Sequence, residues 1–143
     1  MKKRIVILGI AIVLIPIITL AAAASYTSTL YISPGSTHTG AVRDYTKTNH
    51  KISIRADSFP EPKLSKKLVI RIGTKGIFGD FNSKATKVAN LSLGDTTTTY
   101  MGNIGSGKKL YSFSAFENAA TGEGGTGTYY SGVNSDYVKM QSY

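Results

Sequence analysis

Cysteine is absent from this sequence, and that one absence excludes several kinds of chemistry. A chain without thiols forms no disulfide framework, no thiolate metal site, no cysteine nucleophile and no lipid-modified N-terminal cysteine. Tryptophan is absent too, which weakens the case for a module that stacks sugar rings on indole groups. The fold must therefore be held together by a hydrophobic core without covalent cross-links.

Catalytic residue types are scarce as well. The only histidines are His38 and His50, both in stretches typical of polar turns, and no G-x-S-x-G motif accompanies them. Two histidines without cysteine make a poor ligand set for a transition metal, although loop carboxylates leave calcium open. No pattern pairs two of the eight acidic residues as a glycosidase requires. We expect no enzyme, metal or cofactor, with a small secreted hydrolase of unrecognised site as an alternative.

One glycine-rich segment has the spacing of a phosphate-binding loop. Residues 102–109, GNIGSGKK, match G-x-x-x-x-G-K through Lys108. Lys109, however, stands where that loop needs a serine or threonine, and the segment leads into an expected strand, where the motif requires a helix. No nucleotide partner is therefore expected, and nucleic acid is disfavoured.

The N-terminus has the three parts of a secretory signal peptide. Lys2, Lys3 and Arg4 form a basic start, residues 5–20 are almost all apolar, and small residues follow. The pattern predicts cleavage after Ala24, which makes residues 1–24 a signal peptide and residues 25–143 a secreted domain. The alternative is an uncleaved membrane tether, because residues 5–24 are long enough to span a bilayer as a helix. Either way, the domain lies outside the cytoplasm.

The clearest structural signal lies in residues 67–81, KLVIRIGTKGIFGDF. From residue 67 to residue 72, apolar residues at positions 68, 70 and 72 alternate with outward-facing residues at positions 67, 69 and 71. This alternation is typical of a strand with one buried face. The expected buried residues are Leu68, Ile70 and Ile72. Gly73 and Gly76 then flank a predicted reversal at residues 73–76, followed by a return strand.

Similar alternation recurs between turn signals along the rest of the chain, and no amphipathic helical stretch interrupts it. This spacing predicts about seven to nine short strands. Removing the first 24 of 143 residues leaves 119, which suits one domain. We therefore predict an all-β fold, a single antiparallel β-sandwich of jelly-roll or Ig-like type. Glycine-rich residues 119–127 are predicted to be its most flexible segment.

The charge balance favours an anionic partner. The chain has 17 basic and 8 acidic residues, and three of the basic ones belong to the signal peptide, so the domain keeps 14 and a net charge of +6. Such a charge promotes encounter with cell-wall polymers or anionic lipid head groups.

Two pairs of cations are the main candidates for this binding. Lys51 and Arg55 share the outward face of one expected strand, and Lys67 and Arg71 share that of another. If those strands were neighbours, all four cations would line one sheet surface, and a rigid sheet would hold them as an array.

Aromatic residues complete the candidate site. Tyr129 and Tyr130, near the C-terminus, are potential stacking groups. Together these features predict an exported, non-catalytic protein that binds an anionic polymer or lipid at or beyond the cell surface. A secreted antimicrobial or membrane-active protein is the alternative.

Overall fold

Every regular element in the described part of the chain is a β-strand. The structure is a computed structural model that describes residues 23–33, 36–59, 67–115, 117–122, 125–130 and 132–143, and only the backbone of those within 115–131. The strands are β1 (Ser25–Ile32), β2 (Thr37–Thr39), β3 (Arg43–Tyr45), β4 (Asn49–Arg55), β5 (Lys67–Lys75), β6 (Phe81–Asn90), β7 (Thr96–Asn103), β8 (Gly107–Ala115), β9 (Glu117–Gly122), β10 (Gly125–Tyr130) and β11 (Val133–Ser142).

The predicted signal peptide falls almost wholly outside these residues, since the description starts at Ala23. Among the residues that are described, no helix is long and apolar enough to cross a membrane.

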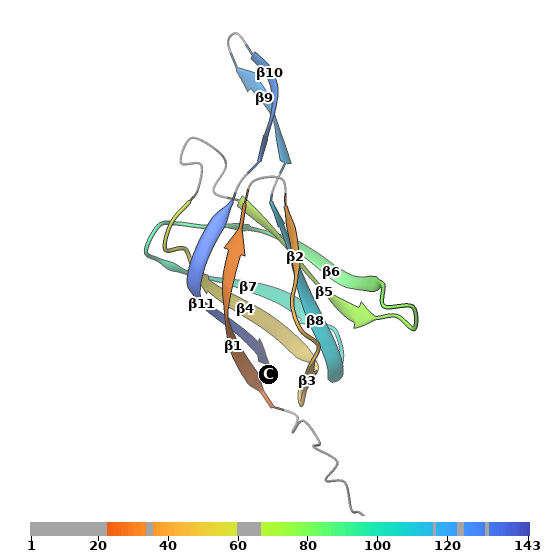
Figure 1. The fold of residues 1–143 in the computed structure, drawn as a ribbon. Helices are drawn as coiled ribbons and strands as arrows, with labels where there is room; N and C mark the ends of the chain where they lie inside the picture. The colour runs from red at the N-terminus through yellow and green to blue at the C-terminus, as the bar shows by residue number, and fades with distance from the viewer. Residues whose placement is uncertain (1–22, 34–35, 60–66, 116, 123–124, 131) are drawn as a thin grey trace, which may run out of the picture.

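The strands form two antiparallel sheets packed face to face (Figure 1). The first sheet has the order β1-β11-β4-β7, and the second has the order β2-β8-β5-β6, with β3 also paired to β8. The chain changes sheet after β1, β3, β4, β6 and β7 and returns to the first sheet with β11. This double-sheet arrangement is that of a jelly roll, so the all-β sandwich prediction is confirmed.

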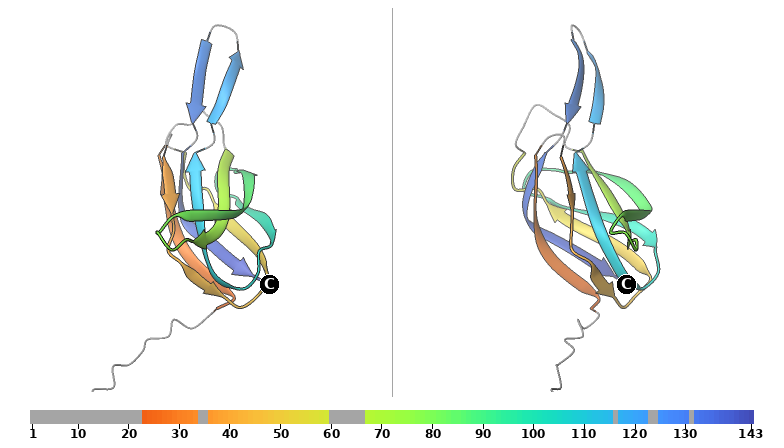
Figure 2. Two further views of the ribbon diagram at one scale, coloured as in Figure 1. Left: turned by 90° about the vertical axis from the view of Figure 1, so that its right-hand side faces the viewer. Right: turned by 45° about the vertical axis from the view of Figure 1, so that its right-hand side comes forward.

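Eleven strands are observed where about seven to nine were predicted, for two reasons. The short strands β2 and β3 both pair with β8 and occupy one edge position of the second sheet. In addition, β9 and β10 have no partner but each other among the described strands, and they project beyond the end of the two sheets (Figure 2).

Alternating aliphatic side chains from the facing sides of the sheets form the core. Ile52 and Ile54 of β4 and Leu68, Ile70 and Ile72 of β5 are each at most 1% exposed. Their neighbours in sequence face outward, as the period of two requires. The predicted buried face of residues 67–72 is confirmed.

The predicted position of the central turn is wrong. Residues 73–75 continue strand β5, and the chain reverses at residues 76–80 instead. Gly73 has a different role: a β-carbon at this position would lie 2.1 Å from the carbonyl oxygen of Asn82 on the neighbouring strand. The register shifts between Ile72 and Gly73, so this glycine permits the close approach of two strands at a bulge.

The described part of the glycine-rich segment near the C-terminus forms two paired strands, and its flexibility remains a prediction. Six residue pairs, from Gly125 with Gly122 to Tyr130 with Glu117, align β9 and β10 as an antiparallel hairpin. Glycine and threonine along these strands do not prevent ladder formation, because the ladder needs only backbone groups.

The core packing gives the first testable prediction. Ile70 is fully buried, and Lys87 stands directly opposite it on β6 but is exposed because β6 is an edge strand. Ile70→Asp should abolish soluble folding, since an unpaired buried carboxylate costs several kcal/mol. Lys87→Asp should change the free energy of unfolding by less than about 1 kcal/mol. Soluble yield and the circular dichroism spectrum measure the first effect and urea unfolding measures the second, and similar behaviour of the two variants would contradict the register.

Candidate functional site

The four candidate cations do not form one array. Lys51 and Arg55 lie on β4 in the first sheet, whereas Lys67 and Arg71 lie on β5 in the second sheet. The inward residues of both strands meet in the core, so the two pairs point away from each other on opposite outer faces. The neighbouring-strand arrangement considered from the sequence is therefore wrong, because strand order depends on long-range pairing that local alternation does not encode.

The outer face of the second sheet is rich in hydroxyl groups. Arg71 donates a hydrogen bond from Nη1 to the Ser114 hydroxyl at 2.8 Å, and the Thr39 hydroxyl donates to that of Ser112 at 3.3 Å. Arg71 is thereby held against its own sheet.

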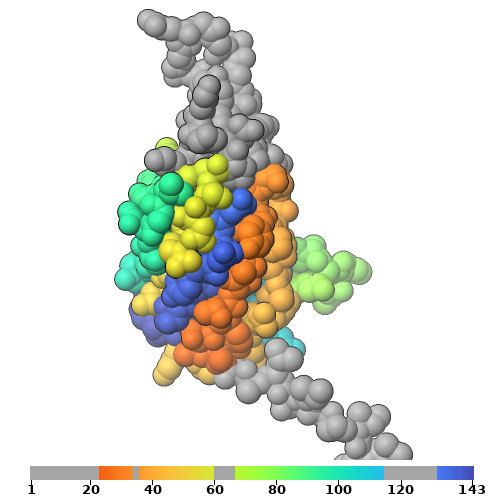
Figure 3. Space-filling view, turned by 60° about the vertical axis from the view of Figure 1, so that its left-hand side comes forward, coloured from red at the N-terminus to blue at the C-terminus, as the bar shows by residue number. Residues whose placement is uncertain are grey.

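The outer face of the first sheet has different chemistry. Figure 3 shows this face, on which β1, β11, β4 and β7 lie side by side. Outward residues on these strands, together with Tyr143 directly after β11, include four tyrosines and three cations, and we call this surface the tyrosine face. Its members are Tyr31, Lys51, Arg55, Tyr100, Tyr137, Lys139 and Tyr143. Tyr31, Tyr100 and Tyr143 are more than half exposed, at 61%, 59% and 51%.

The ammonium group of Lys51 lies over two of these rings. Its Nζ is 5.1 Å from the ring centroid of Tyr143 and 5.9 Å from that of Tyr100. The two rings meet edge to face, with centroids 6.3 Å apart and an interplanar angle of 82°. Both distances are within the range of a cation–π interaction, so an ammonium group and two aromatic surfaces are presented together at one place.

Arg55 forms the second cation–aromatic pair, four residues along β4. Its guanidinium carbon is 6.0 Å from the ring centroid of Tyr137, and its Nε donates to Asp57 Oδ1 at 2.8 Å. Asp57 neutralises much of the charge at this end of the face. The Lys51 end is therefore the more positive one, and Lys139 stands opposite Ser53, midway between Lys51 and Arg55.

Two acidic residues, Asp57 and Asp136, lie close together beside Arg55. No pattern in the sequence predicts this pair. The backbone N–H of Asp136 donates to Asp57 Oδ2 at 2.6 Å, and this bond together with Arg55 lowers the pKa of Asp57 below its usual value. Tyr31 donates its hydroxyl proton to Asp136 Oδ1, which raises the pKa of Tyr31. Both oxygens of Asp57 are thus occupied, and a lowered pKa is the opposite of what a general acid needs.

A metal site has no support in the described residues, where no three acidic, histidine or cysteine side chains gather.

His50 is buried, contrary to the expectation that both histidines occupy polar turns. It lies on β4, where its Nε2 is 2.8 Å from the carbonyl oxygen of Gly105 and its ring meets Tyr45 edge to face at 5.0 Å. Burial lowers the pKa of His50 below 6.5, and the nearby Lys109 adds to this effect, although the bond to Gly105 opposes it. His50 is a core residue, not a surface nucleophile or base.

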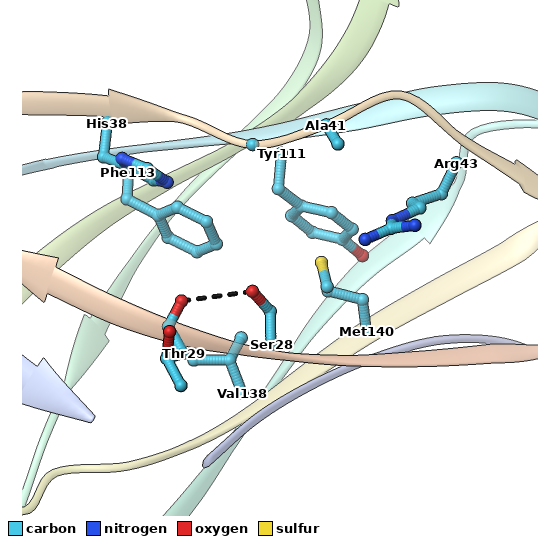
Figure 4. A pocket seen from close by; sticks show the side chains of 10 residues that line it. Ser28, Thr29, His38, Ala41, Arg43, Tyr111, Phe113, Val138 and Met140 are labelled. Atoms are coloured by element: carbon cyan, nitrogen blue, oxygen red, sulfur yellow. Dashed lines mark hydrogen bonds between the residues drawn. The ribbon is translucent and has the colours of Figure 1, made fainter. Parts of the chain in front are cut away.

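A narrow crevice opens between the sheet edges, where β1 faces β2 (Figure 4). Tyr111 and Phe113 of β8 line one side, and Val138 and Met140 of β11 line the other. Its volume of about 30 Å³ holds about two water molecules, which is too little for a larger ligand.

The remaining sequence candidates, Tyr129 and Tyr130, belong to β10, of which only the backbone is described. The sequence reasoning missed Tyr31, Tyr100, Tyr137 and Tyr143. Each lies in or next to an alternating stretch, but which strands share a face becomes evident only from the strand order.

Comparison with known proteins identifies no family. No family model matches the chain, and no curated protein matches it. A CBM36-1 domain of a multidomain xylanase from the hindgut metagenome of Trinervitermes trinervoides is 16% identical, with a TM-score of 0.47 over 82% of this chain and 86% of that one. The structure of infectious bursal disease virus Gt strain is 15% identical, with a TM-score of 0.37 over 94% of this chain and 36% of that one. With TM-scores below 0.5, neither likeness bears on the chemistry of this chain.

The buried histidine gives a pH-dependent prediction. Because the folded pKa lies below the unfolded value of 6.5, the unfolded state binds a proton first as the pH falls. Stability should be constant above about pH 7 and fall below pH 6.5, by at most about 1.4 kcal/mol per pH unit.

Urea unfolding between pH 7.5 and pH 5 measures this slope. His50→Gln should abolish it, while His38→Gln, an exposed control, should keep it. A slope that persists in His50→Gln would assign the titration to another group.

Proposed function

We propose that this protein is an exported, non-catalytic β-sandwich that binds an anionic polysaccharide at the cell surface through its tyrosine face. The observation that supports this best is the placement of the Lys51 ammonium group over the exposed rings of both Tyr100 and Tyr143, which contact each other. An ammonium group attracts the carboxylate or phosphate of an acidic polymer, while the adjacent aromatic surfaces pack against the apolar faces of sugar rings.

The sheet holds the side chains of this site in fixed positions, which favours binding. Lys51 is on a central strand between β11 and β7, so its backbone is fixed on both sides. Side chains that already contact each other lose less conformational entropy when a ligand binds than loop side chains do. The register also places Lys139 diagonally beside Lys51, which provides a second cation for the same region.

The domain carries more basic than acidic residues, and its net charge of +6 supports the same partner. Long-range attraction would bring the polymer to the surface, and the tyrosine face would provide the short-range contacts.

Two matched double variants test the site. Lys51→Gln with Arg55→Gln and Lys67→Gln with Arg71→Gln each remove two cations spaced four residues apart, but from opposite faces. The first should weaken binding to polygalacturonate about tenfold, and the second by no more than about twofold, because only the first faces the tyrosines. Isothermal titration calorimetry with polygalacturonate at low and high salt measures both, with dextran as the neutral comparison.

Equal losses in the two variants would reduce the effect to net charge and remove the tyrosine face from the proposal. Unchanged affinity in both would remove the electrostatic contribution altogether. Tyr100→Ala with Tyr143→Ala then separates stacking from charge, since this variant keeps every cation and should weaken binding about tenfold.

We propose export with cleavage after Ala24. The basic and apolar N-terminal pattern supports this, and β1 starts at the next residue, Ser25. The carbonyl oxygen of Ala24 accepts a hydrogen bond from the N–H of Ser142 at 2.8 Å, and the N–H of Ala23 donates one to the carbonyl oxygen of Asp44 at 3.0 Å. Cleavage after Ala24 would therefore remove two backbone hydrogen bonds.

Mass spectrometry of the secreted and membrane fractions checks the cleavage. A secreted chain that begins at Ser25 is the expected result. A chain that keeps Met1 and stays with the membrane would instead support the tether.

A further inference from the structure

The turn between β5 and β6 presents two large apolar side chains to solvent. Ile77 is 94% exposed and Phe78 is 91% exposed, more than any other large hydrophobic residue whose side chain is described. The turn projects from the body of the sandwich and forms the green protrusion in Figure 3. No described part of the chain covers these two residues, which we call the apolar tip.

Hydrogen bonds and glycines fix the shape of this turn. The N–H of Gly76 donates to the carbonyl oxygen of Asp80 at 2.8 Å, and the N–H of Gly79 donates to that of Gly76 at 3.0 Å. Gly79 has a φ of 85°, a conformation that favours glycine. The backbone thus holds Ile77 and Phe78 at the end of a closed turn, where they cannot fold back onto the sandwich.

Basic residues are concentrated on the hairpin that carries the apolar tip. The hairpin carries Arg71, Lys75, Lys84 and Lys87 between residues 71 and 87, against a single acidic residue, Asp80. Lys75 ends β5 next to the turn, and Lys84 is the unpaired residue of the bulge on β6. Lys75, Lys84 and Lys87 are exposed.

We propose that the apolar tip inserts into the interfacial region of an anionic lipid bilayer, while Lys75 and Lys84 of the same hairpin contact the lipid head groups. An apolar turn with lysines on the strands next to it is complementary to a membrane surface, whose acyl region takes up apolar side chains and whose head groups attract lysine. This membrane contact is separate from the tyrosine face and does not depend on polysaccharide binding.

A protein partner fits the apolar tip less well. A large apolar side chain buries about 150–250 Å². Two such side chains on a narrow turn therefore provide far less than the roughly 800 Å² per partner that a stable protein interface needs. A bilayer needs no complementary pocket, so two side chains suffice to insert.

The absence of tryptophan provides a direct test. Phe78→Trp places the single tryptophan of the chain at the apolar tip, and Leu93→Trp places it at another exposed apolar residue, 61% exposed, beyond the far end of β6. Each variant is purified in the form that cells produce and is mixed with vesicles of phosphatidylglycerol and phosphatidylcholine, or with vesicles of phosphatidylcholine alone. With the anionic vesicles, the emission of the Phe78→Trp variant should shift to the blue and be quenched by brominated lipid, while that of the Leu93→Trp variant should not.

The lysine contribution is measured in the same reporter. Lys75→Gln with Lys84→Gln should lower the affinity for the anionic vesicles about tenfold to thirtyfold. No shift in the Phe78→Trp variant, or equal shifts in the two reporter variants, would overturn the proposal. The proposal would also be overturned if the emission of the Phe78→Trp variant were already shifted to the blue without vesicles and this shift reverted on dilution. A second copy of the chain would then cover the apolar tip. Ile77→Trp repeats the test if Phe78→Trp does not fold.

Discussion

The burial of aliphatic side chains from β4 and β5 in one core is the interaction on which the rest of the structure depends. Each strand buries every second residue, so the core contact decides which residues of both sheets face water. With Ile52 and Ile70 directed inward, Lys51 and Arg71 can only appear on opposite outer faces. The molecule therefore has two chemically distinct surfaces, one with tyrosines and cations and one with hydroxyl groups.

Local patterns in the sequence were enough to predict the strands and their buried residues, because the period of two is a property of neighbouring residues. Strand order was not predictable in this way. Whether β4 lies beside β5 depends on pairings between distant segments, such as Ile54 with Val138 and Ile70 with Phe113. This is why the cation pairs were correctly placed on outward faces but wrongly considered as one array.

Glycine and histidine show a second limit of local reasoning. Gly73 resembles a turn glycine in sequence, yet its role arises from Asn82 on the neighbouring strand, which only the paired structure brings close. His50 follows polar residues typical of a turn, yet Tyr45 and Gly105 enclose its ring. The tyrosine face could be identified only from the strand order, because its members come from four different strands.

Strand β11 has a consequence for how the chain becomes native. It is the last strand in the sequence and lies between β1, the first strand, and β4, and β1 has no other partner strand among the described residues. The first sheet therefore cannot close before the final residues are available. Contacts of such long sequence separation make folding slow and leave the chain open during synthesis. Until β11 is available, β1 has no ladder among the described strands and β4 has only β7, whereas β5 can already pair with β6 and β8 in the second sheet.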